Sequence, residues 1–247
     1  MKKLDRLSAL MGRFDLSVSA TALDQANLVI MADQTTGEPT RLIFAPRDFA
    51  VVEPTASEEP VFCAYACWGG ATNPFLTALP QTVETPIEEG SEMVHIAKLL
   101  QMEGAAPRCG ASAMLDRLGG VLLIRVLRWQ MEQGTTDVSL LGGLADARLS
   151  RAIVAMHDDP GRNWRGDDLA SLAGLSLSRF SELFKTKVGE TPAAYLRRWR
   201  LLLARQDAER GDRIQTIARR YGYGSPEALS RAFRKEFDTS AISLRPT

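Results

Sequence analysis

Apolar positions change their spacing along the chain, from the alternation typical of strands to the three-to-four-residue spacing of helices. Between Phe14 and Ala66, short apolar segments are separated by turn-forming residues such as Thr36-Gly37-Glu38-Pro39. The expected strands are DLSVSA, LVIMA, RLIFA, FAVVE and VFCAYA, which begin at residues 15, 28, 41, 49 and 61. Strands this short need a sheet face or a barrel to bury them.

Two helices are expected after this region, over residues 91–103 and 112–133. The second is long and carries its apolar residues on one face, namely Leu115, Leu118, Leu122, Val126 and Trp129. Such a stripe packs inside a domain or against a second copy of the chain, and we take this helix as the candidate dimer contact.

The last hundred residues contain one pattern twice, LASLAGLSLSRFSELFKTKVG over 169–189 and IARRYGYGSPEALSRAFRKEFD over 217–238. Each copy places an Ala in a short amphipathic helix, then a Gly-containing turn, then a Ser that can cap a second helix. The turn glycines are Gly174 and Gly222, and the capping serines are Ser176 and Ser225. This arrangement predicts two helix-turn-helix units in tandem.

The second helix of each unit should bury one apolar stripe and expose its polar residues. The expected buried residues are Leu177, Phe180, Leu183 and Phe184 in the first copy, and Leu229, Phe233 and Phe237 in the second. One copy alone fits packed helices with solvated faces equally well, but duplication at matched spacing favours the helix-turn-helix interpretation. A long helix that starts at Pro192 should fix the distance between the units.

Charge is distributed unevenly between the two halves of the chain. The whole sequence has 30 basic and 30 acidic residues, whereas residues 148–247 have 19 against 12 and residues 1–147 have 11 against 18. The helix-turn-helix segment is therefore basic and the other segment acidic, as expected for a nucleic-acid-binding module joined to a different kind of domain.

Residues 148–247 resemble the DNA-binding domain of the AraC/XylS family of bacterial transcription regulators. The paired motifs carry the resemblance, together with Tyr195, Arg200 and Ala204 between them. It implies an all-helical module that inserts the second helix of each unit into successive major-groove segments. One departure is Phe237-Asp238, where most members have Phe-Gly, although Asp tolerates a left-handed turn better than most residues.

The resemblance implies base contacts from both second helices. The residues concerned are Ser178, Arg179, Ser181 and Glu182 in the first copy and Glu227, Ser230 and Arg231 in the second. A guanidinium can bond guanine O6 and N7 together, so Arg179 and Arg231 are the candidates for guanine, and Glu182 can accept from a cytosine amino group. Four further residues are expected on phosphates: Lys185, Arg197, Arg198 and Arg234.

The first half resembles the cupin-like sensor domain of one branch of the same family. The resemblance rests on VFCAYACWGGATNPFLTALPQTV from Val61 and LLQMEGAAPRCGASAMLDRLGGVLLIRVLRW from Leu99. We expect an α+β protein, with a small cupin-like β-barrel or sheet and flanking helices over 1–140 and the all-α double helix-turn-helix domain over 148–247. The strand region is short for a complete barrel, which argues against a large ligand pocket. SLLGGLADAR, residues 139–148, is the expected junction.

Candidate chemistry in the first half is sparse. A catalytic cupin would hold a metal through several imidazoles, yet the chain has only His95 and His157, so we expect no catalytic residue, metal or cofactor. The three cysteines, Cys63, Cys67 and Cys109, are either small buried hydrophobes or an oxidant sensor. They form no Cys-x-x-Cys pair, which suggests a reduced, cytoplasmic setting.

The sequence thus predicts a cytoplasmic, sequence-specific transcription regulator without enzymatic activity. Its expected partners are promoter DNA, RNA polymerase, a small-molecule or oxidant effector and a second copy of the chain, with no membrane segment because no apolar run approaches the roughly 20 residues of a bilayer span. Two alternatives stay open. In one, the first half is a degenerate cupin that serves as a dimerisation scaffold for a constitutive regulator. In the other, it is a cupin enzyme fused to a DNA-binding domain.

Overall fold

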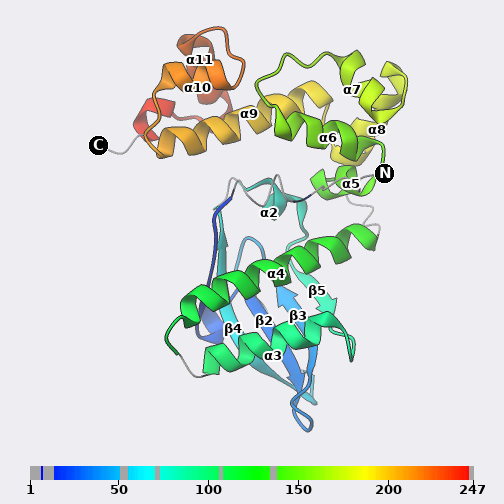
Figure 1. The fold of residues 1–247 in the computed structure, drawn as a ribbon, viewed down its shortest axis with the longest axis vertical. Coiled ribbons are helices and arrows are strands. Elements are labelled where there is room, and N and C mark those ends of the chain that lie inside the picture. Colours follow the sequence, from blue (N-terminus) through cyan, green and yellow to red (C-terminus); the bar gives the residue numbers. More distant parts are fainter. Residues whose placement is uncertain are drawn as a thin grey trace. The chain divides into compact units, whose positions relative to one another are not determined.

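The computed structural model describes residues 7, 14–50, 55–69, 73–105, 108–133 and 138–244 (Figure 1). Among these, residues 14–133 belong to one compact unit and residues 138–244 to another. The first unit combines an antiparallel sheet with helices and the second is helical, so the expected α+β fold is confirmed. None of the helices in the described ranges is both long enough and apolar enough to cross a lipid bilayer.

The N-terminal unit is built on an antiparallel sheet with the strand order β1-β4-β2-β3-β5. The strands are β1 (Leu16–Ala20), β2 (Leu28–Asp33), β3 (Pro39–Phe44), β4 (Glu58–Trp68) and β5 (Val83–Pro86). Strand β5 was not expected. The expected strand at FAVVE is wrong at Phe49 and Ala50, which are not in a strand, and its other residues lie outside the described part.

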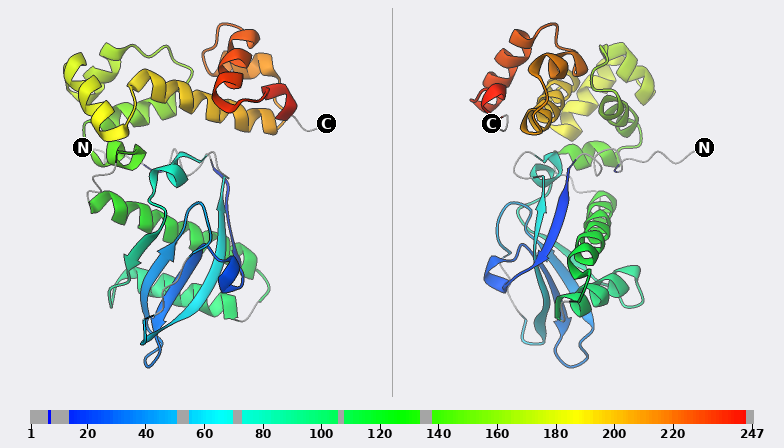
Figure 2. Two further views of the ribbon diagram at one scale, coloured as in Figure 1. Left: turned by 180° about the vertical axis from the view of Figure 1, so that it is seen from behind. Right: turned by 60° about the vertical axis from the view of Figure 1, so that its left-hand side comes forward.

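Two helices, α3 (Glu92–Ala105) and α4 (Ala111–Glu132), cover one face of this sheet (Figure 2). They match the two expected helices to within two residues at each end. Helix α4 lies so close to β1 that a Cβ on Gly119 would fall 2.4 Å from Val18 Cγ2. Of the expected stripe on α4, Leu115, Leu122 and Val126 are buried, whereas Leu118 and Trp129 are half-buried.

The other sheet face is filled by a buried apolar cluster of Ala26, Val29, Met31 and Ile43. Ala50 and Cys63 pack against this cluster. Shorter elements complete the unit: a 3-10 turn η1 (Leu23–Gln25) and the helix α2 (Pro74–Ala78), which Asn73 caps by accepting a hydrogen bond from the Phe75 N–H at 2.9 Å.

The C-terminal unit is helical throughout its described length. Its elements are α5 (Leu140–Ala145), α6 (Leu149–Asp158), α7 (Gly166–Ala173), α8 (Leu177–Val188), α9 (Pro192–Glu209), α10 (Ile214–Arg220), α11 (Pro226–Phe237) and the 3-10 turn η3 (Ala241–Leu244). Within residues 139–148, where the sequence suggests a junction, residues 140–145 form the largely buried helix α5, which packs on α6 and α8.

The linking helix α9 joins two lobes of this unit. The first lobe consists of α5 to α8, and the second of α10, α11 and η3 (Figures 1 and 2). Side chains of α9 enter the core of the first lobe: Tyr195 meets Phe184 edge to face at 5.6 Å, and Trp199 lies 4.4 Å from the buried His157 ring. His157 Nε2 also lies within hydrogen-bond distance of Tyr195 Oη, at 2.5 Å.

Candidate nucleic-acid interface

Each of the two expected helix-turn-helix units forms with the expected turn and cap. In the first, Gly174 adopts a left-handed conformation at φ 67° and Ser176 Oγ accepts from the Arg179 N–H at 3.4 Å. In the second, Gly222 has φ 72° and Ser225 Oγ accepts from the Ala228 N–H at 3.2 Å. Because these turns and caps fix where α8 and α11 begin, they also fix which side chains face outward.

Helix α8 presents all five of its expected DNA-contacting residues to solvent: Ser178, Arg179, Ser181, Glu182 and Lys185. Arg179 Nη1 donates to Glu182 Oε2 at 2.8 Å, and both side chains are more than half exposed. An ion pair this exposed contributes only about 0.2–1 kcal/mol, so a nucleic acid can displace it.

One expectation for α8 is wrong. Leu177 is 45% exposed rather than buried, and the buried stripe consists of Phe180, Leu183, Phe184 and Val188. Leu177 is the first residue of the helix and lies over the start of α7, since a Cβ on Gly166 would fall 2.8 Å from its Cδ1. The outer surface of this unit is therefore more apolar than expected.

Helix α11 presents Glu227, Arg231 and Arg234 to solvent and leaves Ser230 half-buried. Hydrogen bonding to Ser225 and to backbone, together with the charge of Arg231, lowers the pKa of Glu227. Within the part of the chain that the structure describes, neither Arg231 nor Arg234 lies within 4 Å of a carboxylate oxygen in an ion pair. Their guanidinium groups are thus available to an anionic partner. On the inward side, Leu229 and Phe233 are buried as expected, and Phe237 is half-buried.

These α11 residues line an open groove of about 710 Å³ together with Ile214, Pro226 and Lys235. Lys235 was missed in the sequence. The sequence does point to Lys235 as a further DNA-contacting residue, because it follows Arg231 by four residues and so lies on the same side of the helix. The groove combines three cationic side chains with an apolar wall, which suits a polyanion that also offers apolar groups.

The two remaining expected phosphate contacts lie on α9 and differ in their surroundings. Arg197 is exposed. Arg198 is half-buried, forms an ion pair with Glu190 and lies over the Tyr195 ring at 5.7 Å. Arg198 is therefore engaged in holding α9 against the segment before it, and Arg197 is the freer cation of the two.

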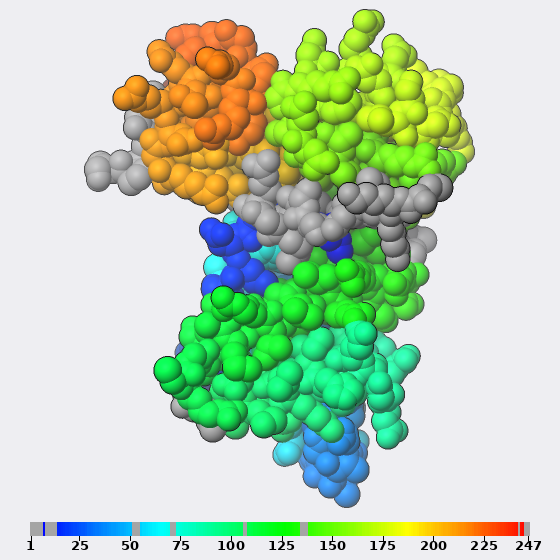
Figure 3. Space-filling model, viewed as in Figure 1, coloured from blue at the N-terminus to red at the C-terminus, as the bar shows by residue number. Residues whose placement is uncertain are grey.

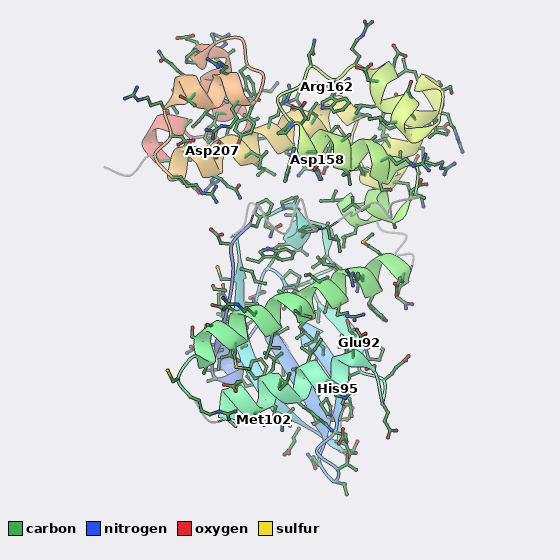
Figure 4. All side chains as sticks on the ribbon, in the orientation of Figure 1. Glu92, His95, Met102, Asp158, Arg162 and Asp207 are labelled. Carbon is green, nitrogen blue, oxygen red and sulfur yellow. The ribbon has the colours of Figure 1, made fainter. Side chains whose placement is uncertain are left out.

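The three cysteines are free thiols. Cys63 and Cys67 lie on one side of β4, but four residues of strand separate their Cα atoms by roughly 13 Å, too far for a disulfide between them. Cys67 and Cys109 are exposed, whereas Cys63 is half-buried and its burial raises the pKa of its thiol. The two histidines belong to different units: His95 is exposed on α3 (Figure 4), and His157 is buried on α6.

Known proteins match both units. Residues 169–246 match a family model described as a helix-turn-helix domain, and residues 17–132 match one described as a cupin. An AraC-like transcription regulator of Streptomyces lividans is 38% identical over 164 residues, which cover 65% of this chain and 54% of that protein. The HTH-type transcriptional regulator AlkR of Acinetobacter baylyi is 33% identical over 178 residues, which cover 70% of this chain and 58% of that protein.

The chain spans about half the length of these curated relatives. Among solved structures, a transcriptional regulator of Chromobacterium violaceum with an AraC-type DNA-binding domain is 27% identical, with a TM-score of 0.38, and the match covers 40% of this chain and 88% of that one. The chain thus carries a helix-turn-helix domain at 169–246 and a cupin domain at 17–132, and it is similar to AraC-like transcription regulators.

Proposed function

We propose that this protein is a transcription regulator that binds promoter DNA sequence-specifically through α8 and α11. The observation that carries the proposal is the pair of capped helices with exposed polar residues at matched positions, on a segment with an excess of basic residues. A helix of this kind fits the major groove, and a basic surface attracts the phosphate backbone.

The residues divide between reading bases and positioning the backbone. Arg231 is the main candidate for guanine, because its guanidinium is exposed and pairs with no carboxylate in the described ranges. Arg179 reads a second guanine once Glu182 releases it, and Glu182 then becomes free to accept from cytosine. The cations suited to phosphates are Lys185, Arg197, Arg234 and Lys235, with Arg198 contributing least because it is held by Glu190.

Selection from a random duplex library tests this function. The chain should enrich a motif with two unlike blocks, because the outward residues of α8 and α11 differ. The double variant Arg231→Ala with Arg179→Ala should lose the enrichment, and the double variant Lys98→Ala with Arg117→Ala, which removes two cations from the N-terminal unit, should keep it. A library that stays random with the wild-type chain would contradict the proposal.

We further propose that the cupin domain passes a signal to the DNA-binding domain without catalysing a reaction. The role of a regulator places the protein in the cytoplasm, with RNA polymerase, an effector and a second copy of the chain as partners. If oxidation is the signal, Cys67 and Cys109 are the reacting thiols, because both are exposed and Cys63 is not. DNA affinity should then change on mild oxidation and stay constant in the double variant Cys67→Ser with Cys109→Ser.

A second candidate has one observation in its favour. The sheet face that α3 and α4 leave open is filled by Ala26, Val29, Met31 and Ile43, which are fully buried. A sheet face that is already filled by side chains leaves little room for a large ligand, so it fits a domain that serves as a dimerisation scaffold better than one that binds such a ligand. DNA affinity that stays the same with oxidant and with a panel of small molecules would favour this constitutive regulator.

A further inference from the structure

The two lobes of the DNA-binding domain touch each other at a second place besides α9. Gly161 lies in the loop between α6 and α7, and Gly222 lies in the turn between α10 and α11. A Cβ on Gly161 would fall 2.3 Å from the backbone oxygen of Arg220, and a Cβ on Gly222 would fall 2.6 Å from the backbone oxygen of Gly161. The lobes are therefore in backbone-to-backbone contact, and only glycine fits at both positions.

Arg200 of α9 forms hydrogen bonds with the loop of the first lobe at this contact. Its Nε donates to the carbonyl oxygen of Pro160 at 2.6 Å, and its Nη2 donates to that of Arg162 at 2.8 Å. A Cβ on Gly222 would also lie 3.5 Å from Arg200 Nη2, so the guanidinium reaches the turn of the second lobe. Hydrogen bonds from a charged donor are stronger than neutral ones, which makes this an effective clasp.

The turn of the second lobe is fastened to the other end of α9. Asp207 is only 8% exposed and accepts from Arg220 Nη1 at 2.5 Å and from Tyr221 Oη at 2.6 Å. Arg220 Nη1 also donates to Asp212 at 2.7 Å. We call the group of Gly161, Arg200, Asp207, Arg220 and Gly222 the inter-lobe junction. In Figure 3 the lime-green surface of the first lobe meets the orange surface of the second.

We propose that the inter-lobe junction fixes the distance and angle between α8 and α11, and that Arg200 is a positioning residue that determines which spacing of DNA half-sites the protein accepts. This inference rests on the proposed DNA binding. One additional base pair moves the second half-site by about 3.4 Å and rotates it by roughly 35°. A protein whose lobes were joined by α9 alone could follow that movement by bending at the helix ends, whereas backbone atoms already in contact cannot.

The test uses the full chain and duplexes selected from a random library by the wild-type protein, with one base pair inserted or removed between the two enriched blocks. Wild-type affinity should fall at least tenfold on either change of spacing. In Arg200→Gln and in Gly161→Ala, affinity for the original spacing should fall about threefold to tenfold, and the added penalty for altered spacing should shrink below threefold. Arg200→Lys keeps the charge but offers no paired donors. Its loss of affinity on altered spacing should therefore lie between that of the wild type and that of Arg200→Gln.

Arg205→Gln is the matched control. Arg205 is also on α9, but within the described ranges its partners lie on the same helix and in the second lobe: it bonds to Glu209 and lies 5.5 Å over the Phe237 ring. It should keep the wild-type spacing penalty. An equal penalty in wild type, Arg200→Gln, Arg200→Lys and Gly161→Ala overturns the inference and leaves the proposed function standing, whereas a library that shows no enriched sequence overturns the proposed function first.

Discussion

Arg179 and Glu182 form an ion pair on the outer surface of α8, with Arg179 Nη1 2.8 Å from Glu182 Oε2. A carboxylate on a helix that approaches DNA repels phosphates and holds back the guanidinium beside it. On the proposed function, the pair should therefore lower affinity for any duplex and limit tight binding to sequences that compensate both charges.

Changing Glu182→Gln should raise affinity for a non-specific duplex, because it frees Arg179 and removes one negative charge. We expect about a threefold to tenfold gain at low salt and a steeper salt dependence, by roughly one released counterion. The preference at one base position should weaken. Fluorescence anisotropy at several salt concentrations measures both effects.

Glu236→Gln is the control for this change, because Glu236 is an exposed carboxylate near the end of α11 and its loss changes the net charge equally. The Glu236→Gln variant should change the affinity for DNA less than Glu182→Gln does, and it should leave the base preference intact. Weaker binding by the Glu182→Gln variant, with the same preference as wild type, would contradict the role given to the pair.

Changing Arg231→Ala should cost about 1–3 kcal/mol of binding free energy on the selected site and relax the preference at one base position. The reason is that a bidentate contact to guanine is lost while the rest of α11 stays in place. A gel-shift titration against the selected site and its single-base variants measures the change.

Arg234→Ala should instead weaken binding to all sequences by a similar factor and reduce the salt slope by about one, as expected for a phosphate contact. Both arginines lie on α11, so the two variants differ in position and not in chemistry. A loss of base preference in Arg234→Ala, with none in Arg231→Ala, would reverse the two assignments.

Changing Asp238→Gly should stabilise the protein by about 0.5–1 kcal/mol, because Asp238 ends α11 in the left-handed region at φ 52° and glycine adopts this conformation without strain. Urea unfolding of the full chain gives the difference. Ala232→Gly, in the interior of the same helix, should act in the opposite direction by about 1 kcal/mol. Equal destabilisation by both changes would show that Asp238 carries no strain.

Asp146 should make stability depend on pH in the acid range. Hydrogen bonds from the Arg148 side chain and from the backbone N–H groups of Arg148 and Leu149 lower the pKa of this carboxyl from its ordinary 3.8 to about 2. A group whose pKa is lowered by folding contributes stability above its unfolded value and loses it as the pH falls toward the folded value. Asp146→Asn should therefore lower the free energy of unfolding by about 1–2 kcal/mol at pH 7, a difference that shrinks to about 0.4 kcal/mol near pH 2 and is lost below it.

Asp158→Asn is the control for this pH effect, since Asp158 is exposed at the end of α6 (Figure 4). The free energy of unfolding of the Asp158→Asn variant should differ from that of the wild type by the same amount at every pH in the acid range. A constant difference between Asp146→Asn and wild type from pH 7 to pH 2 would contradict the assigned coupling.

The parts of the fold that follow from local chemistry were predictable from the sequence. Gly174, Ser176, Gly222 and Ser225 each perform the turn or cap that their residue type suggests, because a left-handed turn and a helix cap depend on a few neighbouring atoms. The limits of α8 and α11 follow from them. Asp238 also occupies a left-handed position, which Asp tolerates better than most residues.

The parts that depend on distant neighbours were not predictable. Strand β5 has only four residues and buries Thr85 beside Val83, so it shows no run of apolar residues. Leu177 has the right spacing for the buried stripe, but it sits at the helix start, where the first turn of α7 rather than the core lies beneath it. The contact of Gly161 with the second lobe joins residues about sixty positions apart, and no local pattern records it.

Selection of bound duplexes from a random library, followed by anisotropy titration of the best sequence, tests the central claim most directly. The account predicts one enriched site with two unlike blocks about one helical turn apart, bound at least a thousandfold more tightly than random duplex of the same length. No enrichment, or an affinity equal to that for random duplex at every salt concentration, would contradict the claim that α8 and α11 read DNA.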